Sequence, residues 1–237
     1  MTRPDDSAPR PLHAIIFDFD GVIADSERLH FRAYQDVLAE DGVAFTQQEY
    51  LASYLGYDDV GMFRQLAKDR GLPMDEARLD ALIERKGARY EALAAAGGMI
   101  FPGAAEFIRI AAAAVPIAIA SGALSHEIHD VLDRVGLRAL FPVIVGADHT
   151  ERSKPAPDPY LHAFERLAAA SGRELDPRRS VAIEDSRWGL DSARGAGLRT
   201  VAVTNTYAAA ELADAAELVV SGLDAVTLEA LDDLCAS

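Results

Sequence analysis

The feature of this chain that most constrains its fold is a short apolar run that ends directly in two aspartates. The run, residues 14–17 (Ala-Ile-Ile-Phe), has the β-branched and aromatic content of a buried strand. Asp18 and Asp20 follow it, and Gly21 allows the backbone to turn sharply there. Carboxylates are costly at the end of a buried strand unless a metal ion or a reaction uses them. An acidic turn is the structural alternative, because aspartate is common in turns.

Beyond this run, a purely helical region is followed by alternating strand and helix patterns. Residues 28–97 contain only amphipathic helical patterns punctuated by glycines, which predicts a separate small bundle. From Pro102 onward, short apolar runs alternate with helical patterns. We expect further strands at residues 115–120, 143–145, 181–183, 200–203 and 218–220. This alternation is typical of a mainly parallel sheet that helices cover on both faces.

The predicted fold class is therefore α/β: a doubly wound, mainly parallel, Rossmann-like sheet with a small all-helical cap inserted after the first strand. Residues 13–27 and 98–237 would form the catalytic core, and residues 28–97 the cap. Residues 1–12 are polar and proline-rich, so we expect a disordered leader and no signal peptide. A chain of 237 residues can bury one sizeable core and a smaller appended unit.

The composition excludes several classes of partner. A net charge of −15 argues against nucleic acid or an anionic membrane surface as the main partner. The alanine-rich stretch at residues 110–120 is too short, and too interrupted by Pro116, to span a membrane. The single cysteine, Cys235, excludes an internal disulfide and suits a reducing compartment. We expect a cytoplasmic protein that is a monomer or a weak dimer.

Polar residues follow four of the predicted strands. They are Asp18 with Asp20, Ser121 with Gly122, Lys154, and Glu184 with Asp185. Because the carboxyl ends of parallel strands share one edge of the sheet, these side chains should converge. Hard carboxylate oxygens suit Mg²⁺, while ammonium and hydroxyl donors suit a phosphoryl group. Only three of the 23 basic residues are lysines, which favours a specific use for the compact ammonium of Lys154.

These motifs resemble those of the haloacid dehalogenase superfamily of phosphotransferases. The four motifs are Asp18-Phe-Asp-Gly-Val, Ser121-Gly, Ser153-Lys154-Pro155 and Glu184-Asp185-Ser186, in the order that the family has them. The resemblance covers nearly the whole chain from His13, and the helical insert looks like the small cap of that family. Within the superfamily, the chain is similar to the subgroup of β-phosphoglucomutase, phosphoglycolate phosphatase and related small-sugar phosphatases.

The resemblance implies a hydrolase of a small phosphorylated metabolite, either a sugar phosphate or a phosphoglycolate-like monoester. Asp18 would be the nucleophile and would form an aspartyl-phosphate. Asp20 would be the general acid for the leaving alcohol and then the general base for water. Ser121 would bind the transferring phosphoryl oxygens, and Lys154 would pair with both Asp18 and the phosphate.

The resemblance also implies a Mg²⁺ site and a set of substrate-binding residues. Asp18, the backbone carbonyl of Asp20, and Asp185 would hold the ion. Glu184 would be either a further ligand or a support for the other ligands. The predicted substrate-binding residues are Gly21, Gly122, His30, Lys86 and Arg187.

Substrate choice is expected to reside mainly in the cap. His30 and Lys86 resemble cap residues of β-phosphoglucomutase, although each also fits an ordinary surface position. Asp58 and Asp59 stand where the mutase carries a phosphate-binding arginine, and two acids cannot hold a second phosphate without help. Arg64, one turn later, could compensate.

Two alternative functions remain open at this point. One is a sugar-phosphate mutase of the β-phosphoglucomutase type, which would share the same core. The other is a catalytically silent binding protein that uses this fold, although every motif residue is intact.

Overall fold

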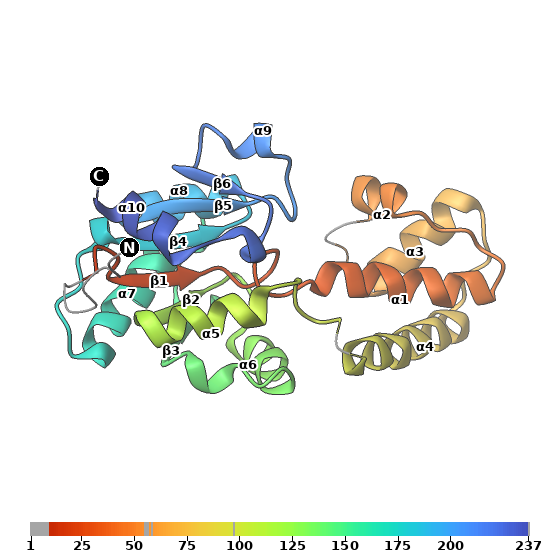
Figure 1. Ribbon diagram of the computed structural model, residues 1–237. Coiled ribbons are helices and arrows are strands. Elements are labelled where there is room, and N and C mark those ends of the chain that lie inside the picture. The colour runs from red at the N-terminus through yellow and green to blue at the C-terminus, as the bar shows by residue number, and fades with distance from the viewer. Residues whose placement is uncertain (1–9, 55–56, 58, 97, 237) are drawn as a thin grey trace, which may run out of the picture. The chain divides into compact units, whose positions relative to one another are not determined.

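The computed structural model describes residues 10–54, 57, 59–96 and 98–236. The chain divides into two compact units (Figure 1). Met1–Ala24 together with Ile100–Ser237 form the core, and Asp25–Met99 form the cap. Each unit has its own cluster of buried apolar side chains.

A six-stranded parallel sheet forms the centre of the core. Its strands are β1 (Ala14–Phe17), β2 (Ile117–Ala120), β3 (Val143–Val145), β4 (Ser180–Glu184), β5 (Arg199–Val203) and β6 (Leu218–Val220). The strand order is β3-β2-β1-β4-β5-β6, so β1 lies between β2 and β4. This arrangement confirms the predicted α/β fold class. It also places the two aspartates after β1 at the middle of the sheet edge, where open α/β sheets bind ligands.

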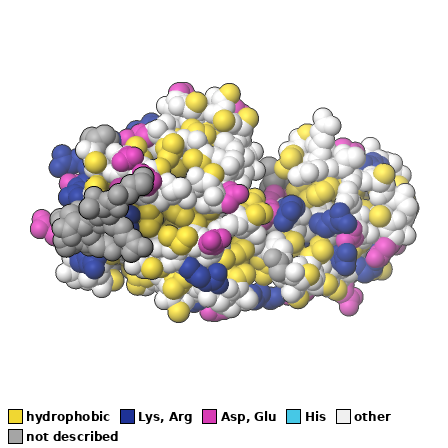
Figure 2. All heavy atoms as spheres, viewed as in Figure 1, with side chains coloured by type: hydrophobic (Ala, Val, Ile, Leu, Met, Phe, Trp, Pro, Cys, Tyr) yellow, Lys and Arg dark blue, Asp and Glu magenta, His cyan; other side chains and the backbone are white. Residues whose placement is uncertain are grey.

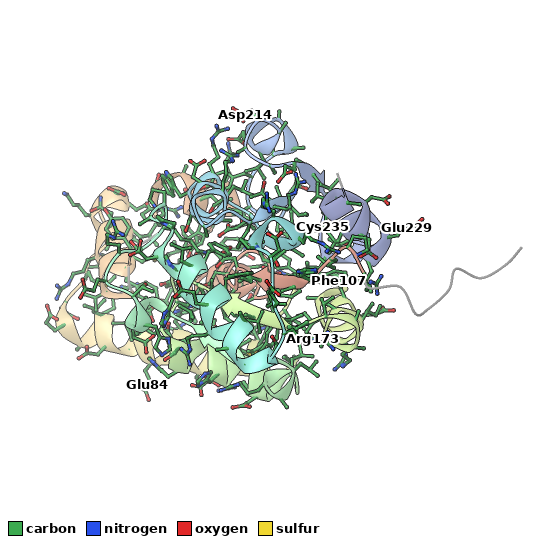
Figure 3. All side chains as sticks on the ribbon, turned by 90° about the vertical axis from the view of Figure 1, so that its left-hand side faces the viewer. Glu84, Phe107, Arg173, Asp214, Glu229 and Cys235 are labelled. Carbon is green, nitrogen blue, oxygen red and sulfur yellow. The ribbon has the colours of Figure 1, made fainter. Side chains whose placement is uncertain are left out.

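Helices cover both faces of the sheet, as its alternating buried side chains require. One face carries α5 (Ala104–Ala114), α6 (Ser125–Arg134) and α10 (Leu228–Ala236). Phe107 of α5 and Cys235 of α10 both pack in the apolar cluster of this face (Figure 3). The other face carries α7 (Asp158–Ser171) and α8 (Arg187–Gly195). Short elements complete the core: α9 (Ala209–Leu212) and 3-10 turns at Arg138–Leu140, Ala147–His149, Pro177–Arg179 and Leu223–Ala225.

The strand predicted at residues 115–120 is shorter in the structure and begins at Ile117. Helix α5 continues to Ala114, and the backbone N–H of Val115 still donates to the helix carbonyl of Ala111 at 2.9 Å. Pro116 has no N–H to donate to a neighbouring strand. Ladder pairing therefore starts at the residue after the proline.

The N-terminal part of the chain is described from Arg10 onward. We predicted a disordered leader at residues 1–12. Residues 1–9 of it lie outside the described residues, and residues 10–12 are described. Arg10 forms an ion pair with Asp232 of α10 at 2.7 Å, and the backbone N–H of Leu12 donates to the same carboxylate at 3.1 Å. Since Leu12 is also buried, the ordered core begins before His13.

The cap consists of α1 (Ser26–Glu40), α2 (Gln47–Ser53), α3 (Asp59–Arg70) and α4 (Glu76–Ala95). Thr46 begins α2 with a capping box in which Glu49 reaches back to the Thr46 N–H. Aromatic rings from α1, α2 and α3 pack together in the interior, and acidic and basic side chains alternate over α1 and α4 (Figure 2). Arg85 pairs there with Glu40. Exposed ion pairs contribute little stability each, so the packed interior holds the cap together.

None of the helices in the described part of the chain combines the length and the apolar character that crossing a bilayer requires.

Candidate active site

The carboxyl ends of β1 and β4 bring charged side chains together. The register pairs Phe17 with Ile183, so the next residues, Asp18 and Glu184, leave neighbouring strands at the same edge. Lys154, from the loop after β3, reaches both of them: its Nζ lies 2.7 Å from Asp18 Oδ1 and 2.6 Å from Glu184 Oε1. The structure thus joins three of the sequence motifs through direct contacts.

A group of three carboxylates completes this cluster. One oxygen each from Asp18, Glu184 and Asp185 lie within 4.8 Å of one another, and all three residues are buried. Three carboxylates face the single ammonium of Lys154, so the cluster carries surplus negative charge. Hard oxygen ligands with surplus charge are the donor set that Mg²⁺ prefers. The residues present therefore fit the ion that the sequence predicts.

Glu184 is held by hydrogen bonds at both of its oxygens. Oε1 accepts from Lys154 and, at 3.0 Å, from the hydroxyl of Tyr160. Oε2 accepts from the backbone N–H groups of Asp185 and Ser186, at 3.0 and 3.2 Å, and from the Ser186 hydroxyl at 3.1 Å. A Cβ at Gly189 would approach Oε1 at 1.8 Å, so only glycine leaves room for this carboxylate. Glu184 is therefore a fixed, fully buried anchor for Lys154.

The loop after β5 supports the acidic site from a second side. The backbone carbonyl of Gly21 accepts a hydrogen bond from the Asn205 side chain at 2.8 Å. Gly21 itself has a positive φ of 78°, and a Cβ there would lie 1.9 Å from Asp185 Oδ2. The hydroxyl of Thr206 donates to the carboxylate of Asp185. Asp20, in the turn that contains Gly21, is exposed, whereas Asp18 is buried.

Ser121 and Gly122 follow β2, the strand that pairs with β1 on the side away from β4. Ser121 is buried, and its hydroxyl oxygen accepts from the backbone N–H of Ala123 at 3.0 Å. Among the described residues, nothing lies within 4 Å of the place where a Cβ at Gly122 would stand. The start of this loop therefore combines a fixed hydroxyl with open backbone.

Burial and mutual repulsion dominate the electrostatics of the acidic cluster. Burial, followed by the charge of Glu184, raises the pKa of Asp18 well above its usual range, and the Lys154 ammonium opposes this shift. Burial raises the pKa of Asp185 to about 6, with the Thr206 hydrogen bond opposing and the charge of Glu184 adding to the rise. Burial alone would lower the pKa of Lys154, but the carboxylates of Asp18 and Glu184 outweigh burial and raise it. The cluster therefore favours binding of a cation.

The predicted cap residues His30 and Lys86 both line a pocket of about 530 Å³ that lies within the cap. Lys86 Nζ lies 2.8 Å from His30 Nδ1 and 2.6 Å from Asp59 Oδ1. Asp58 lies outside the described residues. Arg64 forms an ion pair with Glu76 at 2.8 Å, on the exposed surface of the cap.

Arg187, the remaining predicted substrate-binding residue, is exposed at the start of α8. Its guanidinium donates to Asp214 at 3.0 Å and to the backbone carbonyl of Glu211 at 2.8 Å. These contacts connect the start of α8 to α9 and to the residues that follow it. These partners of the Arg187 guanidinium are separate from the cluster of Asp18, Glu184 and Asp185.

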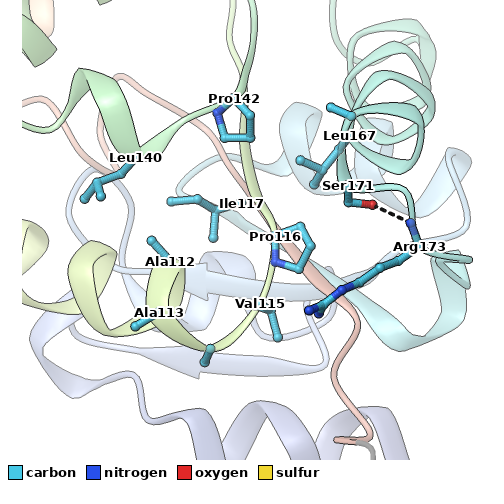
Figure 4. Close-up of a pocket in the computed structure, with 12 residues that line it drawn as sticks. Ala112, Ala113, Val115, Pro116, Ile117, Leu140, Pro142, Leu167, Ser171 and Arg173 are labelled. Carbon is cyan, nitrogen blue, oxygen red and sulfur yellow. Dashed lines mark hydrogen bonds between the residues drawn. The ribbon is translucent and has the colours of Figure 1, made fainter.

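A second cavity, of about 320 Å³, lies at the opposite edge of the sheet (Figure 4). Its walls include Val115, Pro116 and Leu140, which precede β2 and β3, and Leu167 of α7. Alanine, proline and aliphatic side chains form most of its lining. This cavity holds no group of the carboxylate and lysine cluster.

Several residues of the site carry no clear signal in the sequence. Tyr160 lies in the first turn of α7, where a buried aromatic is the usual core residue. Asn205 and Thr206 follow β5, a strand end that carried no motif. The position of Thr206 directly after a parallel strand was the available signal, because all such strand ends share one edge.

Comparison with known proteins gives consistent results. Residues 15–203 match the haloacid dehalogenase-like hydrolase family. Protein CbbY of Rhodobacter capsulatus is 31% identical over 233 residues, covering 94% of this chain and 99% of that protein. Hexitol phosphatase B of Escherichia coli K12 is 31% identical over 198 residues, covering 83% and 86%. A crystal structure of a candidate β-phosphoglucomutase from Thermotoga maritima aligns with a TM-score of 0.75 at 25% identity, covering 94% and 99%.

Proposed function

Because this chain belongs to the haloacid dehalogenase-like hydrolase family, we propose that it is a phosphatase for monoesters of small sugars or polyols. The observation that carries the proposal is the position of Lys154, with its ammonium between the buried carboxylates of Asp18 and Glu184. An anionic nucleophile can approach an anionic phosphate ester only where positive charge offsets the repulsion. The hexitol phosphatase among the relatives supports the substrate class.

In the first step, the Asp18 carboxylate attacks phosphorus and the bond from phosphorus to the ester oxygen breaks. Asp20 gives its proton to the departing alcohol, and the phosphoryl group is left on Asp18 as a mixed anhydride. Lys154 and the Ser121 hydroxyl bind the phosphoryl oxygens during the transfer. The exposure of Asp20 suits this role, because its proton must reach a leaving group outside the buried cluster.

In the second step, a water molecule attacks the phosphorus and the bond between phosphorus and Asp18 breaks. Asp20, now ionised, takes a proton from this water. Inorganic phosphate leaves, Asp18 returns as a carboxylate, and Asp20 regains the proton that it lost in the first step. Each cycle therefore consumes one ester and one water and needs no other reactant.

We propose that Asp18, Asp185 and the backbone carbonyl of Asp20 hold Mg²⁺. Glu184 supports these ligands and Lys154, because both of its oxygens already accept hydrogen bonds from the protein. When bound, the ion supplies positive charge that neutralises the phosphoryl oxygens. The surplus of carboxylates over ammonium in the cluster is what this assignment rests on.

A panel of phosphate monoesters assayed with and without Mg²⁺ tests the proposal. The panel would include 4-nitrophenyl phosphate, phosphoglycolate, hexose phosphates and hexitol phosphates. Asp18→Asn should lower phosphate release by at least about a thousandfold, since it removes the attacking oxyanion. Asp191→Asn, a change to an exposed carboxylate on α8, is the matched control and should retain activity. Metal-dependent turnover by a clean Asp18→Asn preparation would contradict the assignment.

A sugar-phosphate mutase is the second candidate, and the similarity to the Thermotoga maritima structure favours it. A mutase would return the phosphoryl group to a different hydroxyl of the sugar instead of to water. Hexose 1-phosphate incubated with the protein would then yield hexose 6-phosphate, with no inorganic phosphate released. Phosphate release without isomerisation would exclude the mutase, and inactivity toward every ester would favour a binding protein.

A further inference from the structure

The cap contains a buried lysine, which the proposed reaction does not use. Lys86 of α4 is 3% exposed. Its ammonium contacts Asp59 Oδ1 of α3 and His30 Nδ1 of α1, and it lies 4.7 Å from the centroid of the Tyr34 ring. An ammonium is costly to bury unless a partner compensates its charge. Asp59 provides that compensation inside the cap.

The pocket beside Lys86 is more acidic than basic. The residues that line it are Glu27, His30, Tyr34, Tyr50, Tyr57, Asp59, Val60, Ile83 and Lys86. Two carboxylates, those of Glu27 and Asp59, and one ammonium, that of Lys86, line the pocket, and the ammonium is paired with Asp59. Among the described residues that line this pocket, a phosphate group would meet one lysine, which Asp59 already pairs, and a second carboxylate, that of Glu27. Repulsion between the phosphate and the two carboxylates disfavours binding of a phosphate group in this pocket.

His30 adds hydrogen-bonding capacity without adding charge. Burial, and then the charge of Lys86, lower the pKa of His30 to about 4, with Asp59 opposing the shift. The imidazole is therefore neutral near pH 7. Because Nδ1 faces an ammonium, which can only donate, Nδ1 is the acceptor and the ring proton lies on Nε2.

The tyrosines of the pocket complete a lining that suits hydroxyl groups. Tyr34 donates to Asp59 at 2.5 Å, and Tyr50 donates to Glu27. A sugar or polyol hydroxyl can donate to these tyrosine and carboxylate oxygens, while the faces of the rings pack against its C–H groups. Tyr57 is 49% exposed and leaves part of an aromatic surface open at this pocket.

We propose that this pocket binds an uncharged, polyhydroxylated group and that Asp59 excludes a second phosphate from it. The inference rests on the proposed function, because the bound group would be the alcohol part of the phosphate monoester. It narrows the substrate class to monophosphates of sugars or polyols, as opposed to bisphosphates. Asp59 is then a specificity-determining residue, because it neutralises the ammonium of Lys86 that would otherwise attract a second phosphate.

Calorimetric titration of an Asp18→Asn protein, in which turnover cannot consume the ligand, tests this inference. The probes are fructose 1-phosphate and fructose 1,6-bisphosphate, which differ only in the second phosphate. We expect tighter binding of the monophosphate, and a shift of the affinity ratio toward the bisphosphate by on the order of tenfold when Asp59→Asn is added. Asp36→Asn, which removes a partly buried ion-pair partner of Arg89 that does not line the pocket, is the matched control and should leave the ratio unchanged.

Glu27→Gln provides a second way to remove negative charge from the pocket, should Asp59→Asn fail to fold in a thermal melt. It keeps an oxygen that accepts from Tyr50 and should shift the ratio in the same direction. Equal binding of both probes by the Asp18→Asn protein, or an unchanged ratio in the folded charge-removing variants, would overturn the inference. Hydrolysis of 4-nitrophenyl phosphate by the wild type and Asp36→Asn reports separately on the proposed function.

Discussion

The core and the cap each hold a lysine beside carboxylate and aromatic side chains, but the two clusters differ in their balance of charge. In the core, Lys154 lies between Asp18 and Glu184, 5.0 Å from the centroid of the Tyr160 ring. In the cap, Lys86 lies between one carboxylate and a neutral imidazole. The core cluster adds a further carboxylate, Asp185, and so carries surplus charge that fits a metal ion. Lys154 therefore belongs to a cluster with surplus negative charge, whereas the charge of Lys86 is balanced by Asp59.

The two clusters also differ in how the fold assembles them. The core cluster forms at strand ends, where the parallel register fixes neighbouring residues at one edge. The cap cluster needs side chains from α1, α3 and α4 to meet in a helical bundle. A change to Lys154 should therefore affect mainly the phosphoryl transfer, and a change to Lys86 mainly the choice of substrate.

The largest contrast is expected between Lys154→Met and Lys86→Met. Lys154→Met leaves two buried carboxylates without their ammonium, and should lower kcat/KM for 4-nitrophenyl phosphate by on the order of a thousandfold. Lys86→Met removes a charge that Asp59 already compensates. Because 4-nitrophenyl phosphate has no sugar, this variant should lower kcat/KM for that ester by less than about tenfold. Steady-state assays at saturating Mg²⁺ measure both effects. An equal fall in kcat/KM in the two variants would contradict the view that Lys154 serves the chemistry and Lys86 does not.

The pH dependence of metal activation should separate the two regions by about an order of magnitude. Burial raises the pKa of Asp185 to about 6 and the pKa of Asp18 well above its usual range, so protons compete with Mg²⁺ for both proposed ligands. The half-saturating Mg²⁺ concentration should therefore rise by at least about tenfold for each pH unit below pH 6. The pKa of His30 is lowered to about 4, so His30 stays neutral over this range and adds no pH dependence of its own to the ratio of monophosphate to bisphosphate affinity. Mg²⁺ titrations from pH 5 to pH 8 would test this; a flat profile would contradict it.

The smallest effect is expected at Thr206, which holds Asp185 from the loop after β5. Thr206→Val removes that hydrogen bond and should raise the half-saturating Mg²⁺ concentration by about fivefold, corresponding to about 1 kcal/mol. The kcat at saturating Mg²⁺ should remain unchanged, because Thr206 acts through Asp185. Thr206→Ser keeps the hydroxyl and is the rescue control. A loss of kcat without a change in Mg²⁺ requirement would assign Thr206 a different role.

The sequence predicted the core well because its signals are local. An apolar run followed by Asp18 identifies a strand and its end, and parallel pairing then predicts which strand ends meet. Helix α5 was not predicted, because apolar residues fill most of its length, and a mostly apolar run of this kind does not by itself distinguish a helix from a buried strand. Tyr160 was not singled out either, since its hydroxyl contact with Glu184 depends on how α7 packs on the sheet.

The cap was less predictable because its site depends on helix packing. His30 and Lys86 came from a family resemblance, and Asp59 stood out only as an acid in an unexpected position. The contact between Asp59 and Lys86 joins α3 to α4 across 27 positions of sequence. No local periodicity fixes such a contact, since it depends on the relative rotation of both helices.

The central claim is that Asp18 attacks phosphorus while Asp20 moves the proton. The most direct test is rapid acid quenching of Asp20→Asn with 4-nitrophenyl phosphate and Mg²⁺, followed by peptide mass spectrometry. Nitrophenolate leaves without a proton, so the first step should proceed, while the second step lacks its base. We predict a burst of nitrophenolate and a phosphoryl group trapped on Asp18. Absence of that adduct, or its presence on another residue, would contradict the account.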